Sequence, residues 1–398
     1  MKLLPSAKNV VFSVIFFVLL TGVTFAAVEI ADRLLLGLQS HALIFPARKT
    51  MVFPGDEGTW TVHTNWLGLR DPETHQIVKR NGIRIAAIGD SFTFGWGVND
   101  QDAWPLLLET ALDQAEVWNL GRPGAGPREY ADIAESVIDY LHADLILVGV
   151  LQADDLKQCT ARSRPTPEPL TAVMKRWLPG FTLTAERIRK KPSFWESVPE
   201  QIEPTWRAMA ASVVASFTPA EREKYGKIPE KVRTLFMAGS LNPALIDIAT
   251  KSPSYFTDVL KENPETQEIS KCLSDTLLRI RAVAKRNRAR VLVMSIPYGI
   301  YTSRDAQETR ALLGFDVGED FLTTRKVDVV VAGAAKSAGL PFVAFTDQFR
   351  KESLRQRLFL EWDGHLNRAG NKFLAQLIAA HLQNKPNLEL SDLPPGEN

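Results

Sequence analysis

The sequence predicts an α/β protein whose parallel sheet is covered by helices on both faces. Three short apolar runs, 83–88, 143–151 and 290–296, have the length and composition of buried strands. Segments between them, at 103–112 and 127–141, repeat apolar residues at the spacing of one buried helical face. Alternation of strands and helices is typical of a parallel sheet with helical crossovers.

Composition narrows the classes of function only slightly. The 398 residues can form one large domain or two, and contents of 45% hydrophobic and 23% charged residues are ordinary for a globular protein. A formal net charge of +1 gives no reason to expect a nucleic acid or a strongly acidic partner. Function must therefore be inferred from local features.

The N-terminal stretch, residues 1–31, is predicted to be a membrane anchor. Residues 9–28 carry no charge, and twenty helical residues span roughly 30 Å, the thickness of a bilayer's hydrocarbon core. Lys2 and Lys8 precede this run, which places the N-terminus in the cytoplasm and the rest of the chain outside a single-pass inner membrane. A cleaved signal peptide is the alternative, but Thr24-Phe25-Ala26 is a poor cleavage site.

Residues 32–82 form a connecting region with several turn residues. Its stretch 64–71, T-N-W-L-G-L-R-D, is expected to form a short hairpin that leads into the first strand. Asn65 and Arg70 in this stretch could rim a site, although a turn and a surface position are the more ordinary expectations.

A large insertion is predicted at 159–271. The residues 160–271 contain 12 of the 24 prolines, so long regular elements cannot dominate there, and short helices are expected at 203–216 and 227–237. Because the insertion follows the third strand, it emerges at the carboxyl edge of the sheet. It could form a lid or a substrate wall there, or contact a partner.

The two cysteines, Cys159 and Cys272, lie at the two ends of this insertion. In an extracytoplasmic protein a disulfide between them would close its base. Two buried thiols are the alternative.

Regular structure resumes after the insertion. A helix at 270–287, the strand 290–296, a helix near 319–338, a strand at 341–346 and a helix from 368 are expected in that order, with Asn367 as the last helix's cap. The tail 384–398 is rich in Pro, Asn and acidic residues and is expected to be disordered.

The first strand ends in the tripeptide Gly-Asp-Ser, residues 89–91. Ser91 therefore lies at the carboxyl edge of a parallel sheet, where ligands and chemistry are usually found. It is a candidate nucleophile if a base and hydrogen-bond donors can reach it; otherwise Asp90 and Ser91 only cap the next helix.

Three motifs in order resemble the blocks of the SGNH (GDSL-type) hydrolase family. They are G-D-S at 89–91, N-L-G-R-P-G at 119–124 and D-G-H-L-N at 363–367, and the resemblance covers 83–383 apart from the insertion. It implies a flavodoxin-like three-layer α/β/α domain, formed by 83–158 and 272–383. Its five parallel strands would have the order 2-1-3-4-5, and the chain would be similar to membrane-anchored bacterial members.

The resemblance also implies a catalytic triad. Ser91 would be the nucleophile, His365 its general base, and Asp363 the group that orients the imidazole. The family usually places this aspartate three residues before the histidine, whereas here the gap is two. Glu361 and Asp347 are therefore kept as alternative acids.

Donors for an oxyanion would be the backbone N–H groups of Ser91 and Gly124 and an asparagine side chain. In this sequence Asp154 occupies the asparagine position, and an ionised carboxylate cannot donate a hydrogen bond. Three alternatives stay open: Asp154 is protonated in a desolvated site, Gln152 supplies the amide, or two backbone donors suffice. Gly124 could equally be an ordinary turn residue.

The expected function is that of an extracytoplasmic serine esterase acting on acyl esters, with envelope carbohydrates or glycolipids as the expected substrates. The same triad would serve a polysaccharide O-acyltransferase, and a non-catalytic binding or assembly protein could retain the scaffold. No cofactor or metal is expected, because the glycines at 121–126 lack the spacing of a dinucleotide-binding loop and no ligand cluster accompanies Asp154.

Overall fold

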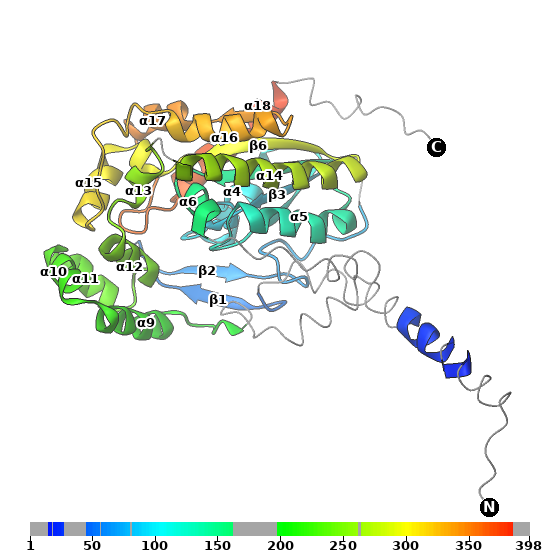
Figure 1. Ribbon diagram of the computed structural model, residues 1–398, viewed down its shortest axis with the longest axis horizontal. Helices are drawn as coiled ribbons and strands as arrows, with labels where there is room; N and C mark the ends of the chain where they lie inside the picture. The colour runs from blue at the N-terminus through cyan, green and yellow to red at the C-terminus, as the bar shows by residue number, and fades with distance from the viewer. Residues whose placement is uncertain are drawn as a thin grey trace, which may run out of the picture.

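The structure is a computed structural model that describes residues 15–17, 19–27, 45–55, 57–79, 82–161, 197–261 and 264–384 (Figure 1). Its main body is a five-stranded parallel sheet with the strand order β4-β3-β5-β6-β7. This confirms the predicted order 2-1-3-4-5. The strands are β3 (Ile83–Gly89), β4 (Ala115–Gly121), β5 (Leu145–Leu151), β6 (Arg290–Ile296) and β7 (Phe342–Ala344).

Both faces of the sheet are buried, which explains why its strands are continuous apolar runs. Alternate residues of β3 enter two different cores: Ala86 and Ile88 belong to one, Ile85 and Ala87 to the other. The first core is completed by α5 (Pro127–Leu141), α14 (Pro264–Arg286) and α16 (Lys326–Ser337). The second is completed by α4 (Trp104–Ala111), α17 (Thr346–Ser353) and α18 (Arg368–Gln383).

Several predicted helix boundaries were wrong. Helix α14 begins at Pro264 rather than 270, and α16 begins at Lys326 rather than 319. Helix α15 (Arg304–Leu312) was not predicted at all. Its sequence is polar nearly throughout and only Arg310 is buried, so it has no apolar periodicity from which a helix could be inferred.

The predicted hairpin at 64–71 was also wrong, because the hairpin lies just before it. Strands β1 (Thr50–Phe53) and β2 (Trp60–His63) pair antiparallel. Residues 64–71 turn around the side chain of Asn65, whose Oδ1 accepts hydrogen bonds from the backbone N–H groups of Leu67 (2.9 Å) and Leu69 (3.1 Å). An amide that satisfies its own neighbours in this way favours a turn over a ladder.

Arg70 is buried rather than exposed at the surface. Its guanidinium donates to the backbone carbonyls of Phe94 (3.1 Å), Gly95 (2.6 Å) and Val98 (2.5 Å), and it pairs with Asp100 at 2.7 Å. These carbonyls belong to the end of the short helix that Ser91 begins and to the loop that follows it. The connecting region therefore holds this loop in place, an arrangement that the position of Arg70 in the sequence did not reveal.

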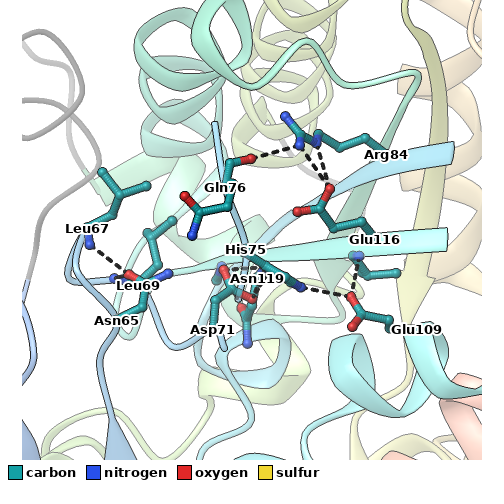
Figure 2. A network of polar contacts seen from close by, with 12 residues as sticks. Asn65, Leu67, Leu69, Asp71, His75, Gln76, Arg84, Glu109, Glu116 and Asn119 are labelled. Atoms are coloured by element: carbon teal, nitrogen blue, oxygen red, sulfur yellow. Dashed lines mark hydrogen bonds and ion pairs between the residues drawn. The ribbon is translucent and has the colours of Figure 1, made fainter. Parts of the chain in front are cut away.

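A polar network fastens the connecting region to the outer strand β4 (Figure 2). Both carboxylate oxygens of Asp71 accept the backbone N–H of Asn119 at 3.0 Å, and Glu109 Oε2 accepts that of Val117 at 2.7 Å. His75 Nε2 lies 3.1 Å from the same Glu109 oxygen. Side chains thus satisfy the N–H groups that an edge strand would otherwise leave unpaired.

The described part of the insertion is helical. It contains α9 (Glu203–Ser216), α10 (Pro219–Lys227), α11 (Glu230–Met237), α12 (Pro243–Lys251) and α13 (Tyr255–Asp258). The helix predicted at 203–216 is confirmed, whereas the segment 227–237 is divided between the end of α10 and α11. Trp206 packs in a small aromatic core with Phe53, Trp60 and Trp96.

The predicted anchor falls mostly outside the described residues. Residues 15–17 and 19–27 are helical, and nothing in the described part of the chain forms a helix that is both long and apolar enough to cross a bilayer. Of the tail predicted to be disordered, 384–398, residues 385–398 lie outside the described residues as well.

Cys159 and Cys272 form a disulfide with a Cα–Cα distance of 5.7 Å. It joins α6 (Asp154–Ala161), which leads into the insertion, to α14, which leads out of it. Arg128 of α5 donates from Nε to Cys272 Sγ at 3.5 Å and from Nη2 to the Cys159 carbonyl at 3.3 Å. The crosslink therefore closes the base of the insertion against the sheet domain.

Replacing both cysteines by serine is expected to lower the free energy of unfolding by about 2–4 kcal/mol, because the crosslink restricts the unfolded chain. Chemical denaturation of oxidised wild type, reduced wild type and the double variant measures this. Reduced wild type should match the variant. Equal stability of all three proteins would contradict a crosslink in the native protein.

Candidate active site

Strand β3 delivers Ser91 to the carboxyl edge of the sheet. The chain turns directly from this strand into the short helix α3 (Ser91–Phe94), and Asp90 caps that helix by accepting the Phe92 N–H at 2.9 Å. Asp90 therefore caps the helix, as one prediction had it, but the cap does not use the Ser91 hydroxyl, which can bond to another group. Gly121 of β4 makes the close approach of this helix possible, since a Cβ there would lie 2.1 Å from Phe94 N.

The structure brings Ser91, His365 and Asp363 together. Ser91 Oγ lies 2.7 Å from His365 Nε2, across a sequence separation of 274 residues. His365 Nδ1 is hydrogen-bonded to Asp363 Oδ1. If Nδ1 carries the proton that it shares with Asp363, then Nε2 is free to accept one from Ser91. This is the order of contacts that a serine nucleophile requires.

The two-residue spacing of Asp363 and His365 works because Gly364 lies between them. Gly364 has a φ of +82°, a left-handed conformation that favours glycine. The chain therefore folds back, so that Asp363 Oδ1 accepts the His365 backbone N–H at 3.3 Å as well as contacting its ring. One turn thus replaces the longer spacing expected for the family.

Arg310 holds this turn in place through hydrogen bonds to its backbone. The buried guanidinium donates to the carbonyls of Trp362 at 2.8 Å and Asp363 at 2.6 Å. A Cβ on Gly364 would lie 1.5 Å from Arg310 Nη2, so the two residues require each other. Sequence reasoning missed Arg310, because a lone arginine on a polar helix gives no signal of burial.

Asp363 is ionised in this environment. Burial alone would raise its pKa, but the charge of His365, the hydrogen bonds from His365 and the nearby Arg310 lower the pKa of Asp363 below its ordinary value. The alternative acids are engaged elsewhere: Glu361 pairs with Arg357, and Asp347 pairs with Arg325 and Arg350.

The backbone N–H groups of two cavity-lining residues, Ser91 and Gly124, are candidate donors to an oxyanion. That of Ser91 is the first of α3, where a helix offers no intrahelical acceptor. Gly124 has a φ of +75°, is exposed, and has no atom within 4 Å of where a Cβ would be. Both residues line the same cavity. Their placement suits the two oxyanion donors that the resemblance implies.

Gln152 does not line this cavity. It is fully buried, and its Nε2 donates to Asp328 at 2.8 Å and to Thr346 at 2.7 Å, while its Oε1 accepts the Tyr298 N–H at 3.1 Å. The amide is therefore used to join β5 to the neighbouring elements of the sheet. In this arrangement the Gln152 amide does not reach the cavity as a third oxyanion donor.

Asp154 does line the cavity, at the start of α6. Its Oδ1 accepts the hydroxyl of Tyr255, and its Oδ2 accepts Nε2 of Gln158 at 3.3 Å. Burial raises the pKa of Asp154, and these hydrogen bonds and the charge of His365 offset the shift only in part.

Two more buried carboxyl groups lie near Asp154. Asp155 accepts the hydroxyl of Tyr130 and the N–H of Leu151, and burial raises its pKa well above the ordinary value. Burial and the nearby Asp154 raise the pKa of Asp90 to about 7. No group of three or more residues suited to hold a metal ion occurs in the described part of the chain.

The cavity beside Ser91 has a volume of about 600 Å³ and two unlike walls. The sheet domain contributes four polar side chains, Arg128, Glu129, Asp154 and Gln158, together with Phe92, Trp96, Pro123, Leu151 and Tyr298. The insertion contributes a mainly apolar wall: Trp206, Met209, Pro243, Ala244, Leu245 and Ile248. Such a cavity suits a molecule with one polar and one apolar part.

Comparison with known proteins gives structural matches only. No protein-family model matches the sequence, and no curated protein matches it. A lipolytic protein of the G-D-S-L family from Veillonella parvula has a TM-score of 0.37 at 12% identity, covering 76% of this chain and 100% of that one. The acetyl xylan esterase AlAXEase gives 0.36 at 11%, covering 75% and 100%.

A catalytic mutant of an acetylxylan esterase from Geobacillus stearothermophilus has a TM-score of 0.34 at 12% identity, covering 77% of this chain and 95% of that one. Because these TM-scores and identities are low, the function of this chain must be argued from its own site.

Replacing Gly364 by alanine is expected to slow the reaction of Ser91 with a fluorophosphonate by about 100-fold or more, because the displaced turn misaligns Asp363 and His365. The rate of labelling, followed by intact mass, measures this. Gly333→Ala, at a helical site with no atom within 4 Å of the new Cβ, is the matched control and should label like wild type. Unchanged labelling of Gly364→Ala would contradict the role of this turn.

Proposed function

We propose that this chain is a serine esterase that hydrolyses acyl esters through an acyl-Ser91 intermediate. The observation that carries the proposal is the 2.7 Å contact between Ser91 Oγ and His365 Nε2, extended through Nδ1 to Asp363. A hydroxyl becomes an effective nucleophile when a positioned base takes its proton. A serine that only capped a helix would need neither contact.

The first half of the reaction forms the acyl-enzyme. Ser91 Oγ attacks the ester carbonyl carbon while its proton passes to His365 Nε2, and Asp363 stabilises the imidazolium. The carbonyl oxygen becomes an oxyanion, which accepts the N–H groups of Ser91 and Gly124. The bond to the leaving alcohol then breaks, and His365 returns the proton to that alcohol. Water repeats these steps to release the acid.

The cavity supports an acyl ester with an uncharged acyl group. Its apolar wall, from α9 and α12, suits the acyl part, and its polar wall suits a hydroxyl-rich alcohol such as a sugar. The apolar run at 9–28 supports an anchored protein whose site faces the exterior of the cytoplasmic membrane. Esters of envelope carbohydrates or glycolipids are accordingly the proposed substrates.

Labelling with a fluorophosphonate tests the proposal. Protein from residue 45 onward is expected to be modified once, at Ser91, and to release acid from small aryl esters. Ser91→Ala should abolish both, and His365→Ala should lower turnover by about 10⁴-fold or more. A protein that is folded yet neither labelled nor active would contradict an esterase and indicate a non-catalytic scaffold.

The same assay in the presence of an oligosaccharide separates hydrolysis from acyl transfer. Hydrolysis gives free acid in equal amount with and without the sugar. Transfer would instead give an acylated sugar at the expense of the acid, and mass spectrometry distinguishes the two products.

A further inference from the structure

Asp154 lies at the position where the family resemblance implies a third oxyanion donor, and it carries a carboxyl group rather than an amide. Strand β5 ends at Leu151, beside β3, and Ala153 follows with a φ of +65°, a conformation that side chains other than glycine seldom adopt. This turn starts α6 at Asp154. The half-buried carboxyl group faces the cavity that Ser91, Gly124 and His365 also line.

Two side chains hold the Asp154 carboxyl group in that direction. The Tyr255 hydroxyl contacts Oδ1 from α13, and the Gln158 amide contacts Oδ2 from one turn further along α6. Lys157 bonds to Asp258 at 3.0 Å and ties the same two helices together. The carboxyl group is therefore positioned by both the sheet domain and the insertion.

The charges around Asp154 favour its neutral form. No lysine or arginine pairs with it in the described residues, and Arg128 of α5, which lines the same cavity, donates to Cys272 and to the Cys159 carbonyl. Groups that face Asp154 from the other elements are mostly acidic or phenolic: Asp90, Asp155, Glu129, Tyr255 and Tyr298, with His365 as the basic exception. Burial raises the pKa of Asp154 further.

We propose that Asp154, in its protonated form, donates the third hydrogen bond to the oxyanion that forms at Ser91. This inference rests on the proposed esterase function. When Ser91 Oγ bonds to the carbonyl carbon, the π electrons of the carbonyl move to its oxygen and the Ser91 proton moves to His365. The Asp154 hydroxyl points its hydrogen at that oxygen and keeps its proton, so it enters and leaves the step unchanged.

The donor therefore makes the enzyme sensitive to alkaline pH. His365 must be neutral to act as a base, which produces a rising limb of activity with pH. When Asp154 ionises it no longer donates and its charge opposes the oxyanion, so activity falls again, by about tenfold per pH unit in the limit. An asparagine at this position would donate at every pH and would give no falling limb.

The test compares the pH dependence of kcat/KM for an aryl ester in wild type, Asp154→Asn and Asp154→Ala, between about pH 5 and pH 9. Wild type should give a bell-shaped profile. Asp154→Asn should retain acid-side activity within a few fold and lose the falling limb. Asp154→Ala should lose about 10²–10³ in kcat/KM at acid pH, because no donor replaces the carboxyl group.

Asp90→Asn is the matched control, since it removes the neighbouring buried carboxyl group while its side-chain oxygen can still accept the Phe92 N–H. It should keep the falling limb. A falling limb that persists in Asp154→Asn, or Asp154→Ala as active as wild type at acid pH, would overturn the inference. So would a wild-type profile that stays flat to about pH 9, whether or not the variants fold.

Fluorophosphonate labelling of Ser91 in the same samples separates the two proposals. If Ser91 is labelled and the Asp154→Asn profile is unchanged, only the role of Asp154 is wrong. If Ser91 is not labelled at any pH, the esterase function fails and the inference fails with it.

Discussion

The contact between Ser91 and His365 depends on the rigid placement of two turns that are far apart in the chain. The first ends β3 and is held by Arg70, which bonds to the carbonyls of Phe94, Gly95 and Val98. The second carries His365 and is held by Arg310, which bonds to the carbonyls of Trp362 and Asp363. Each turn is thus fastened by one buried guanidinium, whose planar donors suit several carbonyls at once.

Burying these two guanidinium groups removes them from water, and other contacts in the fold must offset the lost hydration. Burial lowers the pKa of Arg70, and Asp100 offsets the loss of hydration by pairing with it. Arg310 lies near the Asp363 carboxyl group, whose pKa its charge helps to lower, and 5.9 Å from the ring centroid of Tyr298. Removing either arginine would leave buried carbonyls without hydrogen-bond donors. The turn that carries those carbonyls would then be free to shift, and a catalytic site does not tolerate such a shift.

The sequence predicted the parts of the fold that hydrophobic patterning determines. Strands β3, β5 and β6 are buried on both faces, so their apolar runs mark them clearly, and the family resemblance supplied the strand order. Helix α15 and the hairpin of β1 and β2 were missed, since α15 is polar and the strands of the hairpin are only four residues each. Short or polar elements are held by tertiary contacts that no local pattern records.

In the candidate site, too, some features were predicted from sequence motifs and others depend on tertiary contacts. Ser91, Asp363 and His365 were named from motifs, and the structure places them in contact. From the sequence, Gln152 was a candidate for the third oxyanion donor, but its hydrogen bonds to Asp328 and Thr346 direct the amide into the core. Which hydrogen-bond partner a side chain takes depends on the groups that the fold brings near it. A sequence can therefore suggest a donor without showing that this donor is available.

The aromatic core between the hairpin and the insertion limits how the cavity can admit a substrate. Trp206 of the insertion stacks on Trp96 with ring centroids 5.9 Å apart, and Trp96 lies 5.9 Å from the His365 ring. Swinging the apolar wall outward would expose about 150–250 Å² of tryptophan surface, at about 4–6 kcal/mol. Fewer than about one molecule in a thousand would be open at rest. Any opening of this wall therefore carries a free-energy cost that the binding of substrate has to offset.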